Sequence, residues 1–236
     1  MKATNAKKAT KPKAAKTRPV GRPRADRRRR ERPPDEEILF QAARLFARQG
    51  VAATTTRQIA AAAGLRQPSL FHWFPTKDAI VEALLESTIG ATLDHAERVS
   101  KERHGAALRL FRVLRFDARH LCSSPYDLTA LVLSPESRSS RYGRFWKRRA
   151  RLIEIIGDLI AAGIREGSLV EMDRKLATRL VFGMDEGVLT WFDREGAWTP
   201  DLVGETFAEL ALRALLRDPK DLAALQREAG PLHDEP

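Results

Sequence analysis

Beyond residue 34, apolar residues recur every three or four positions along most of the chain. This spacing gathers them on one face of a helix, and no stretch shows a strand-like alternation of useful length. We therefore predict an all-α fold. The expected helices cover residues 35–49, two short segments between 55 and 74, a fourth from 77 to beyond 85, and then 105–121, 126–133, 142–166, 173–193 and 201–217.

The segment 54–77, TTTRQIAAAAGLRQPSLFHWFPTK, carries the signals of two short helices joined by a tight turn. Thr55 with Gln58 three residues later is the capping-box pattern of a helix start. Gly64 suits a left-handed residue at a helix end, and Pro68 suits the first turn of the next helix. Two helices joined in this way are typical of a helix-turn-helix DNA-binding unit.

The second short helix combines an inward apolar face with an outward polar one. Leu70 and Phe74 are four residues apart, so we expect both to pack on the core. A carboxamide such as that of Gln67 can form hydrogen bonds with an adenine edge. The guanidinium of Arg57, at the start of the first short helix, has the geometry to form hydrogen bonds with guanine. Pro68 offers an apolar face to a thymine methyl group. The pattern therefore predicts a surface that reads bases in the major groove.

At these residues the chain resembles the tetracycline-repressor (TetR) family of bacterial transcriptional regulators. The detailed resemblance covers about residues 35–85, and further on it is limited to the helical plan and residues 186–191. The matching positions are Thr55-Thr56-Arg57, Ile59-Ala60, Ala63-Gly64-Leu65, Gln67-Pro68-Ser69-Leu70-Phe71, Trp73-Phe74 and Lys77, with Ile38 to Phe46 and Gly50 before them and Ala79 to Leu84 after them.

The resemblance implies an N-terminal three-helix DNA-binding domain followed by a helical ligand-binding and dimerisation domain. We expect a basic tail over residues 1–34, the DNA-binding domain over 35–85, the regulatory domain over 86–218 and a C-terminal tail over 219–236. The implied function is repression by a homodimer that binds a palindromic operator on double-stranded DNA and is released by a small-molecule effector. Dimerisation is expected through residues 142–166 and 201–217, although their apolar stripes can equally pack within one subunit.

The family also implies roles for individual residues. Those matching Thr56 and Lys77 contact phosphates, and those matching Arg57 and Gln67 contact bases. The chain departs from the family at Phe71, which is usually tyrosine, and at Trp73, usually histidine or tyrosine. The predicted DNA-binding residues are Thr56, Arg57, Gln67, Pro68, Ser69, Phe71, His72, Trp73 and Lys77.

The charge of +11 is concentrated at the N-terminus. Residues 1–34 hold six Lys and eight Arg against Asp26 and Glu31, a net charge of +12, so the rest of the chain carries −1. Within this tail, Gly21-Arg22-Pro23-Arg24 resembles an AT-hook, in which Arg22, Pro23 and Arg24 lie in the minor groove. A solvated charge run that raises non-specific affinity is an equal alternative. An architectural, weakly specific DNA-binding protein is the alternative function.

Effector contacts are expected in the regulatory domain, where each candidate can also be ordinary core. The candidates are Phe111, Phe116, Leu131, Met184 and Trp191.

The sequence argues against an enzyme. Asp117 and His120 share a helix face, but no nucleophile, base and orienting group come together, and no metal-binding spacing is present. We therefore expect no cofactor and no metal. A single cysteine, Cys122, excludes an internal disulfide and suits the cytoplasm, and a redox role would require a lowered thiol pKa. The most apolar stretch, residues 152–164, is interrupted by Glu154 and Asp158, so we expect no membrane span.

Overall fold

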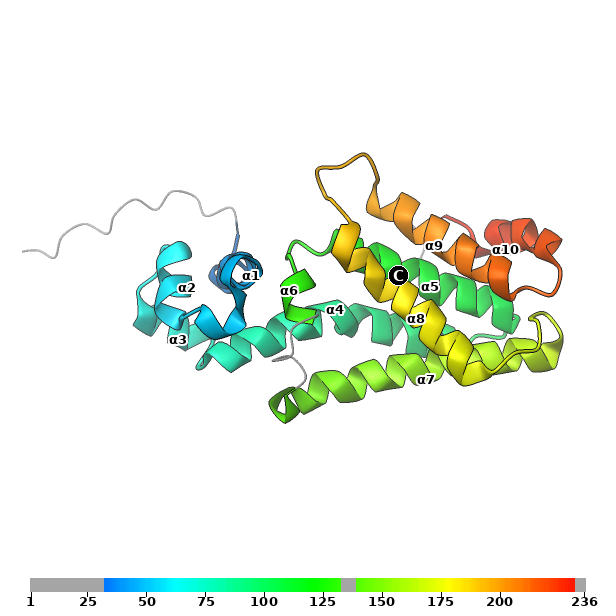
Figure 1. Cartoon of the computed structure of the whole chain (residues 1–236), viewed down its shortest axis with the longest axis horizontal. Helices are drawn as coiled ribbons and strands as arrows, with labels where there is room; N and C mark the ends of the chain where they lie inside the picture. The colour runs from blue at the N-terminus through cyan, green and yellow to red at the C-terminus, as the bar shows by residue number, and fades with distance from the viewer. Residues whose placement is uncertain (1–31, 133–138, 232–236) are drawn as a thin grey trace, which may run out of the picture. The chain divides into compact units, whose positions relative to one another are not determined.

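The computed structural model describes residues 32–132 and 139–231, and most of these residues lie in helices (Figure 1). In this part of the chain the one β-type pairing is an isolated bridge between Leu169 and Leu216. The predicted all-α class is confirmed. The helices are α1 (Pro34–Ala53), α2 (Thr56–Ala62), α3 (Gln67–Trp73), α4 (Lys77–Val99), α5 (Ala106–Ser123), α6 (Thr129–Val132), α7 (Gly143–Glu166), α8 (Arg174–Trp191), α9 (Pro200–Leu215) and α10 (Leu222–Ala229), with 3-10 turns η2 (Ser140–Tyr142) and η3 (Pro219–Asp221).

The first helices pack around one small core. Ile38 and Phe46 of α1, Ile59 of α2, Leu70 of α3 and Ile80 of α4 are all fully or almost fully buried. These are the apolar positions of the helical pattern, so burying them fixes the orientation of α3 relative to α1 and α4. The polar face of α3 is left at the surface.

Helix α1 does not end where its pattern predicts. Gly50 interrupts it with a φ of 80°, a left-handed conformation that glycine adopts at little cost, and one further turn follows to Ala53. The start agrees with the prediction, because Asp35, Glu36 and Glu37 occupy the first turn, where the helix dipole favours acids.

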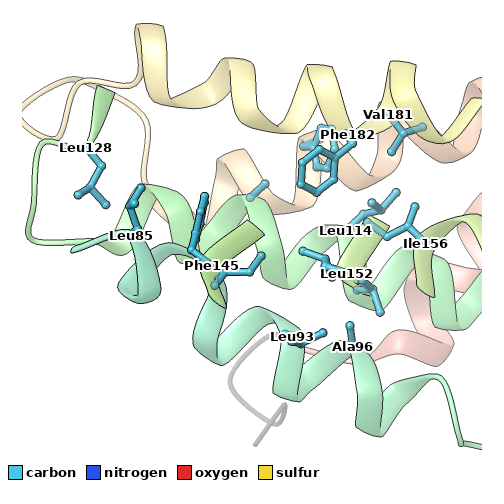
Figure 2. Close-up of a cluster of buried hydrophobic side chains, with 14 of the residues drawn as sticks. Leu85, Leu93, Ala96, Leu114, Leu128, Phe145, Leu152, Ile156, Val181 and Phe182 are labelled. Atoms are coloured by element: carbon cyan, nitrogen blue, oxygen red, sulfur yellow. The ribbon is translucent and has the colours of Figure 1, made fainter. Parts of the chain in front are cut away.

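Helix α5 lies at the centre of the helices that follow α3 and contacts α4, α7, α8 and α9. Figure 2 shows Leu114 of α5 among Leu152 and Ile156 of α7 and Phe182 of α8. Helix α9 approaches α5 closely at Gly204, where an added Cβ would lie 2.6 Å from the carbonyl oxygen of Arg115. A larger residue there would therefore force the two helices apart.

The end of the chain differs from the expected tail, which the sequence places at residues 219–236. Residues 219–229 instead form η3 and α10. The side chain of Leu222 is buried, and the buried guanidinium of Arg115 donates a hydrogen bond of 2.8 Å to the Gly230 carbonyl. Leu222 and the distant Arg115 help to fix this short helix, together with Leu225 and Ala229, which pack against the core, and these scattered contacts give no strong sequence signal.

No helix in the described ranges is long and apolar enough to cross a membrane.

Candidate nucleic-acid interface and regulatory site

The turn between α2 and α3 has the local geometry that its residues predict. The backbone N–H of Gln58 donates to Thr55 Oγ1 at 3.2 Å, and the backbone N–H of Thr55 donates to Gln58 Oε1 at 2.8 Å. These two hydrogen bonds complete the capping box. Gly64 ends the helix with a φ of 63°, and Pro68 lies in the first turn of α3. Local sequence thus fixes how α3 leaves α2.

The outward residues of α2 and α3, together with Lys77 at the start of α4, form the surface that we call the reader surface. Arg57, Pro68, Ser69 and His72 are exposed, as are the large rings of Phe71 and Trp73, at 42% and 44%. The ring of His72 stands edge-on to that of Trp73, with centroids 5.8 Å apart. Most of the sequence-predicted residues are therefore accessible at the surface, while Leu70 is fully buried as expected. The remaining members are Thr56, Gln67 and Lys77.

Two predicted DNA-contacting residues bond to each other across the turn. Gln67 Nε2 donates to Thr56 Oγ1 at 3.0 Å. The bond restricts the carboxamide and leaves its oxygen and second N–H for a base edge. A side chain held in this way loses less conformational entropy on binding than a free glutamine.

Lys77 is engaged within the fold. Its ammonium donates to the carbonyl oxygens of Val51 and Thr54, at 2.7 and 2.9 Å, where α1 ends. Such charge-assisted bonds tie the start of α4 to the end of α1. No local pattern indicates this contact, because 26 positions separate Lys77 from Val51. The tail residues Arg22, Pro23 and Arg24 lie outside the described residues.

A second exposed surface lies on α8 and α9, and we call it the α8–α9 face. Its side chains are apolar and between 44% and 65% exposed. Trp191 and Trp198 meet edge to face, with centroids 6.0 Å apart, beside a groove of about 310 Å³. The face consists of Leu176, Leu180, Met184 and Trp191 on α8, Trp198 in the following loop, and Leu202 and Leu210 on α9.

The exposed apolar residues only partly coincide with the helices whose apolar stripes were expected to form a dimer. The stripe of α7, with Phe145, Leu152 and Ile156, is buried within the chain (Figure 2). The exposed apolar residues lie on α8, which was not expected to contribute, and on α9, which was. Helix α8 has apolar residues on two sides, so sequence alone did not show which helix keeps an uncovered stripe.

The predicted effector contacts do not share one cavity. Phe111 and Leu131 are buried in the core, and Phe116 stacks on His95 with ring centroids 4.1 Å apart. Met184 and Trp191 belong to the α8–α9 face. These side chains therefore form no common pocket.

Comparison with known proteins places the chain in a family. Residues 38–84 match the family model described as bacterial regulatory proteins, tetR family, and residues 106–215 match a tetracyclin repressor-like C-terminal domain. The crystal structure of AmtR from Mycobacterium smegmatis is 36% identical, with 86% of this chain and 99% of that chain covered and a TM-score of 0.72. The chain belongs to the TetR family.

Further relatives agree with this TetR-family membership. The HTH-type transcriptional repressor KstR2 of Rhodococcus jostii is 26% identical over 197 residues, covering 76% of this chain and 89% of the relative. A structure of AibR in complex with isovaleryl coenzyme A and operator DNA is 19% identical, covers 79% of this chain and 99% of AibR, and has a TM-score of 0.58. At that identity it supports the fold alone. As a TetR-family member, the chain is a DNA-binding transcriptional regulator.

In the C-terminal part of this TetR-family chain, Asp117 of α5 and Asp185 of α8 form a buried pair that sequence reasoning did not bring together. Their exposed fractions are 3% and 1%. Burial raises the pKa of Asp117 to about 6, against the opposing effect of hydrogen bonds with Asp185 and Thr92. The pKa of Asp185 lies well above its usual range because the carboxyl is buried and close to Asp117. Two acids 68 positions apart on different helices give no sequence motif.

The environment of Cys122 bears on the redox role that a lowered thiol pKa would allow. Cys122 is 2% exposed, and burial raises the pKa of its thiol to about 12. The thiolate that reacts with oxidants is therefore not formed near neutral pH, which argues against a redox sensor.

Two contacts connect the regulatory helices to the DNA-binding helices. Helix α6 packs on α1, and its Thr129 hydroxyl donates to the Leu189 carbonyl of α8 at 2.7 Å. At the start of α4, Asp78 accepts hydrogen bonds from Tyr142 Oη and from the Arg141 guanidinium, both at 3.0 Å. A shift of α7 or α8 can thus be passed to α1 and α4, which support α3.

Proposed function

We propose that this regulator is a repressor that binds a palindromic operator as a homodimer, with one reader surface in each half-site. The observation that carries the proposal is the reader surface itself. Arg57, Gln67 and Ser69 offer hydrogen-bonding groups there, beside the exposed ring of Phe71. Side chains of these types read base edges and hold phosphates in the major groove.

The α8–α9 face supports the homodimer. A single reader helix contacts too few base pairs to define a site, so helix-turn-helix proteins pair two of them about 34 Å apart. Leu180, Met184 and Leu210 are large exposed apolar residues of this face, and a second copy of the same face is complementary to them. The proposed dimer thus buries the apolar surface of α8 and α9, which is left exposed in a single chain.

Release by a small-molecule effector is the third part of the proposal. The links from α6 to α1 and from Tyr142 to Asp78 provide a physical route between a regulatory ligand and the reader helices. The AibR structure contains both a coenzyme A thioester and operator DNA, so this fold can hold both kinds of ligand. An effector must bind the released arrangement more tightly than the DNA-bound one, because only that difference shifts the equilibrium.

The test is selection of bound sites from random double-stranded DNA with the purified full chain. We expect a palindrome whose half-sites are about one helical turn apart. Sedimentation of the complex should give two chains on each site. Recovery of unrelated sequences, or of an unpaired half-site with one chain bound, would refute the proposal.

The net charge of +12 in residues 1–34 favours a second candidate, an architectural DNA-binding protein driven by that tail. A chain that begins at residue 35 separates the two functions. For a repressor, the truncation weakens binding and lowers its salt dependence but keeps the sequence preference. Loss of all sequence preference on truncation supports the architectural role instead.

A further inference from the structure

The acid pair of Asp117 and Asp185 faces a small cavity between the regulatory helices. The cavity is lined from α4, α5, α6, α7 and α8, and its volume is about 20 Å³, enough for one water-sized group. Neither carboxyl oxygen of Asp185 accepts a hydrogen bond from a donor among the described residues, and the group that interacts with it is the second acid, Asp117. A buried acid with unsatisfied oxygens at a cavity wall is costly unless a ligand completes it.

Among the described residues that line the cavity, the one arginine is paired with a different acid. Arg149 of α7 reaches the same cavity, but its Nε and Nη2 donate to Glu186 at 2.9 and 2.6 Å. The imidazole of His120 lies 2.9 Å from the Ser87 carbonyl oxygen. Asp117, Asp185 and Glu186 thus outnumber the one arginine at this cavity. The positive group at this cavity is thus paired with Glu186, and the Asp117–Asp185 pair shows no cation bonded to it among the described residues.

The size and chemistry of the cavity point to one kind of group. A primary ammonium is as small as a water molecule and donates three hydrogen bonds to acceptors such as carboxylates. A metal ion fits less well, because no cluster of three or more His, Cys, Asp or Glu in the described ranges is arranged to hold one. A quaternary ammonium has no N–H to donate. The walls beside the acids are apolar, with Ile89, Leu121 and Val132 among them, which suits a short alkyl chain.

We propose that Asp117 and Asp185 bind a protonated nitrogen of the effector. The effector is either the free ammonium ion or a small alkylamine with a primary ammonium group. This inference rests on the proposed release by a small molecule and names its chemistry. Val132 of α6 and Leu189 of α8 also line the cavity, and α6 packs on α1. An alkyl chain longer than the present cavity therefore has to displace α6. Because α6 packs on α1, this displacement alters the packing beneath the reader helices α2 and α3.

The first test measures thermal unfolding of the full chain at pH 8 in sodium chloride of constant ionic strength. Ammonium chloride, n-butylammonium chloride and tetramethylammonium chloride are compared. We expect a primary ammonium at saturating concentration to raise Tm by about 5 °C, and tetramethylammonium to leave it unchanged. A shift with ammonium chloride assigns the free ion, whereas a shift with butylammonium alone assigns an organic amine. An equal shift with tetramethylammonium, or none with any of them, overturns the proposal.

Substitutions that keep the shape of the side chains separate binding from folding. Asp117→Asn and Asp185→Asn should each abolish the shift, while the unfolding of the ligand-free variants stays cooperative, because removing an acid with a raised pKa relieves a cost. Asp94→Asn, at an exposed acid on α4, is the matched control and should keep the full shift. A shift that persists in both pair variants contradicts the assignment.

Binding should also depend on pH. The pair must release protons before it can accept a cation, so affinity rises from pH 6 to pH 8, while the alkylamine stays protonated, as lysine does. The other titratable or charged groups around the pair are Glu186, Arg149, His120 and Cys122. His120→Gln should keep the pH dependence, and a flat profile in that variant would assign the effect to the histidine instead. These readouts use no DNA, so failed site selection would remove the proposed function without affecting them.

Discussion

The reader surface and the α8–α9 face both expose large apolar side chains, but their polar surroundings differ. On the reader surface, Phe71 and Trp73 alternate with hydrogen-bonding groups such as Gln67 and Ser69 within two turns. On the α8–α9 face, the neighbours of Leu180 and Met184 one helical turn away include Leu176, Gly183 and Gly187. Exposure alone therefore does not indicate a partner. The groups beside the exposed side chains distinguish a nucleic-acid surface from one that fits a second copy of the chain.

The largest effect should come from placing charge on the α8–α9 face. The double variant Leu180→Glu with Met184→Glu brings four like charges together in the proposed dimer, so we expect monomers. Affinity for the palindromic site should fall by about 100-fold or more, because the two readers no longer bind as one unit. Sedimentation gives the mass, and gel-shift titration gives the affinity.

The matched control for that variant is Lys175→Glu on the same helix. It changes the charge by the same amount but lies on a different groove, beside Gly157 and Thr178. We expect it to stay dimeric and to lose only the non-specific part of DNA affinity. A double variant that remains dimeric would show that this face does not form the subunit contact.

The two surfaces also differ in how much of them could be predicted from sequence. Capping, the left-handed Gly64 and the early Pro68 are local signals, and each is found as the sequence predicts. The fate of the apolar stripes on α7 and α8 depends on which helices cover them, which is a long-range property. The same limit applies to the acid pair, whose members meet only after α5 and α8 pack. Helix α10 was missed because its position depends on Arg115, more than 100 positions away.

On the reader surface, Gln67→Ala should have the next largest effect. We expect a loss of about 1–3 kcal/mol of discrimination at one base position in each half-site, because a bidentate contact is removed. Binding to a panel of singly substituted operators measures it. Gln41→Ala is the control, since that half-buried glutamine bonds Glu37 on α1 instead of lying on the reader surface. An unchanged panel profile for Gln67→Ala would remove this residue from base reading.

Lys77→Met tests whether a charged residue of the reader surface acts through the fold. Loss of the bonds to the Val51 and Thr54 carbonyls should lower the free energy of unfolding by about 1–2 kcal/mol, measured by urea titration. We expect the salt dependence of DNA binding to stay unchanged, since the ammonium is already occupied. A slope lower by about 0.9 for each subunit would instead establish the phosphate contact that the family resemblance implies.

The smallest effect should be a gain. Phe71 stands where TetR-family members usually have tyrosine, and it is 42% exposed, so we expect the surface to accommodate an added hydroxyl. Phe71→Tyr should tighten operator binding about threefold, because one new hydrogen bond to a phosphate contributes roughly 0.5–1.5 kcal/mol net. Phe192→Tyr, at the end of α8, adds the same group away from the reader surface and should leave affinity unchanged. Equal affinities for Phe71→Tyr and the unsubstituted chain would mean that this ring faces away from the DNA backbone, and the reader would then depend on Trp73 and His72 for phosphate contacts on α3.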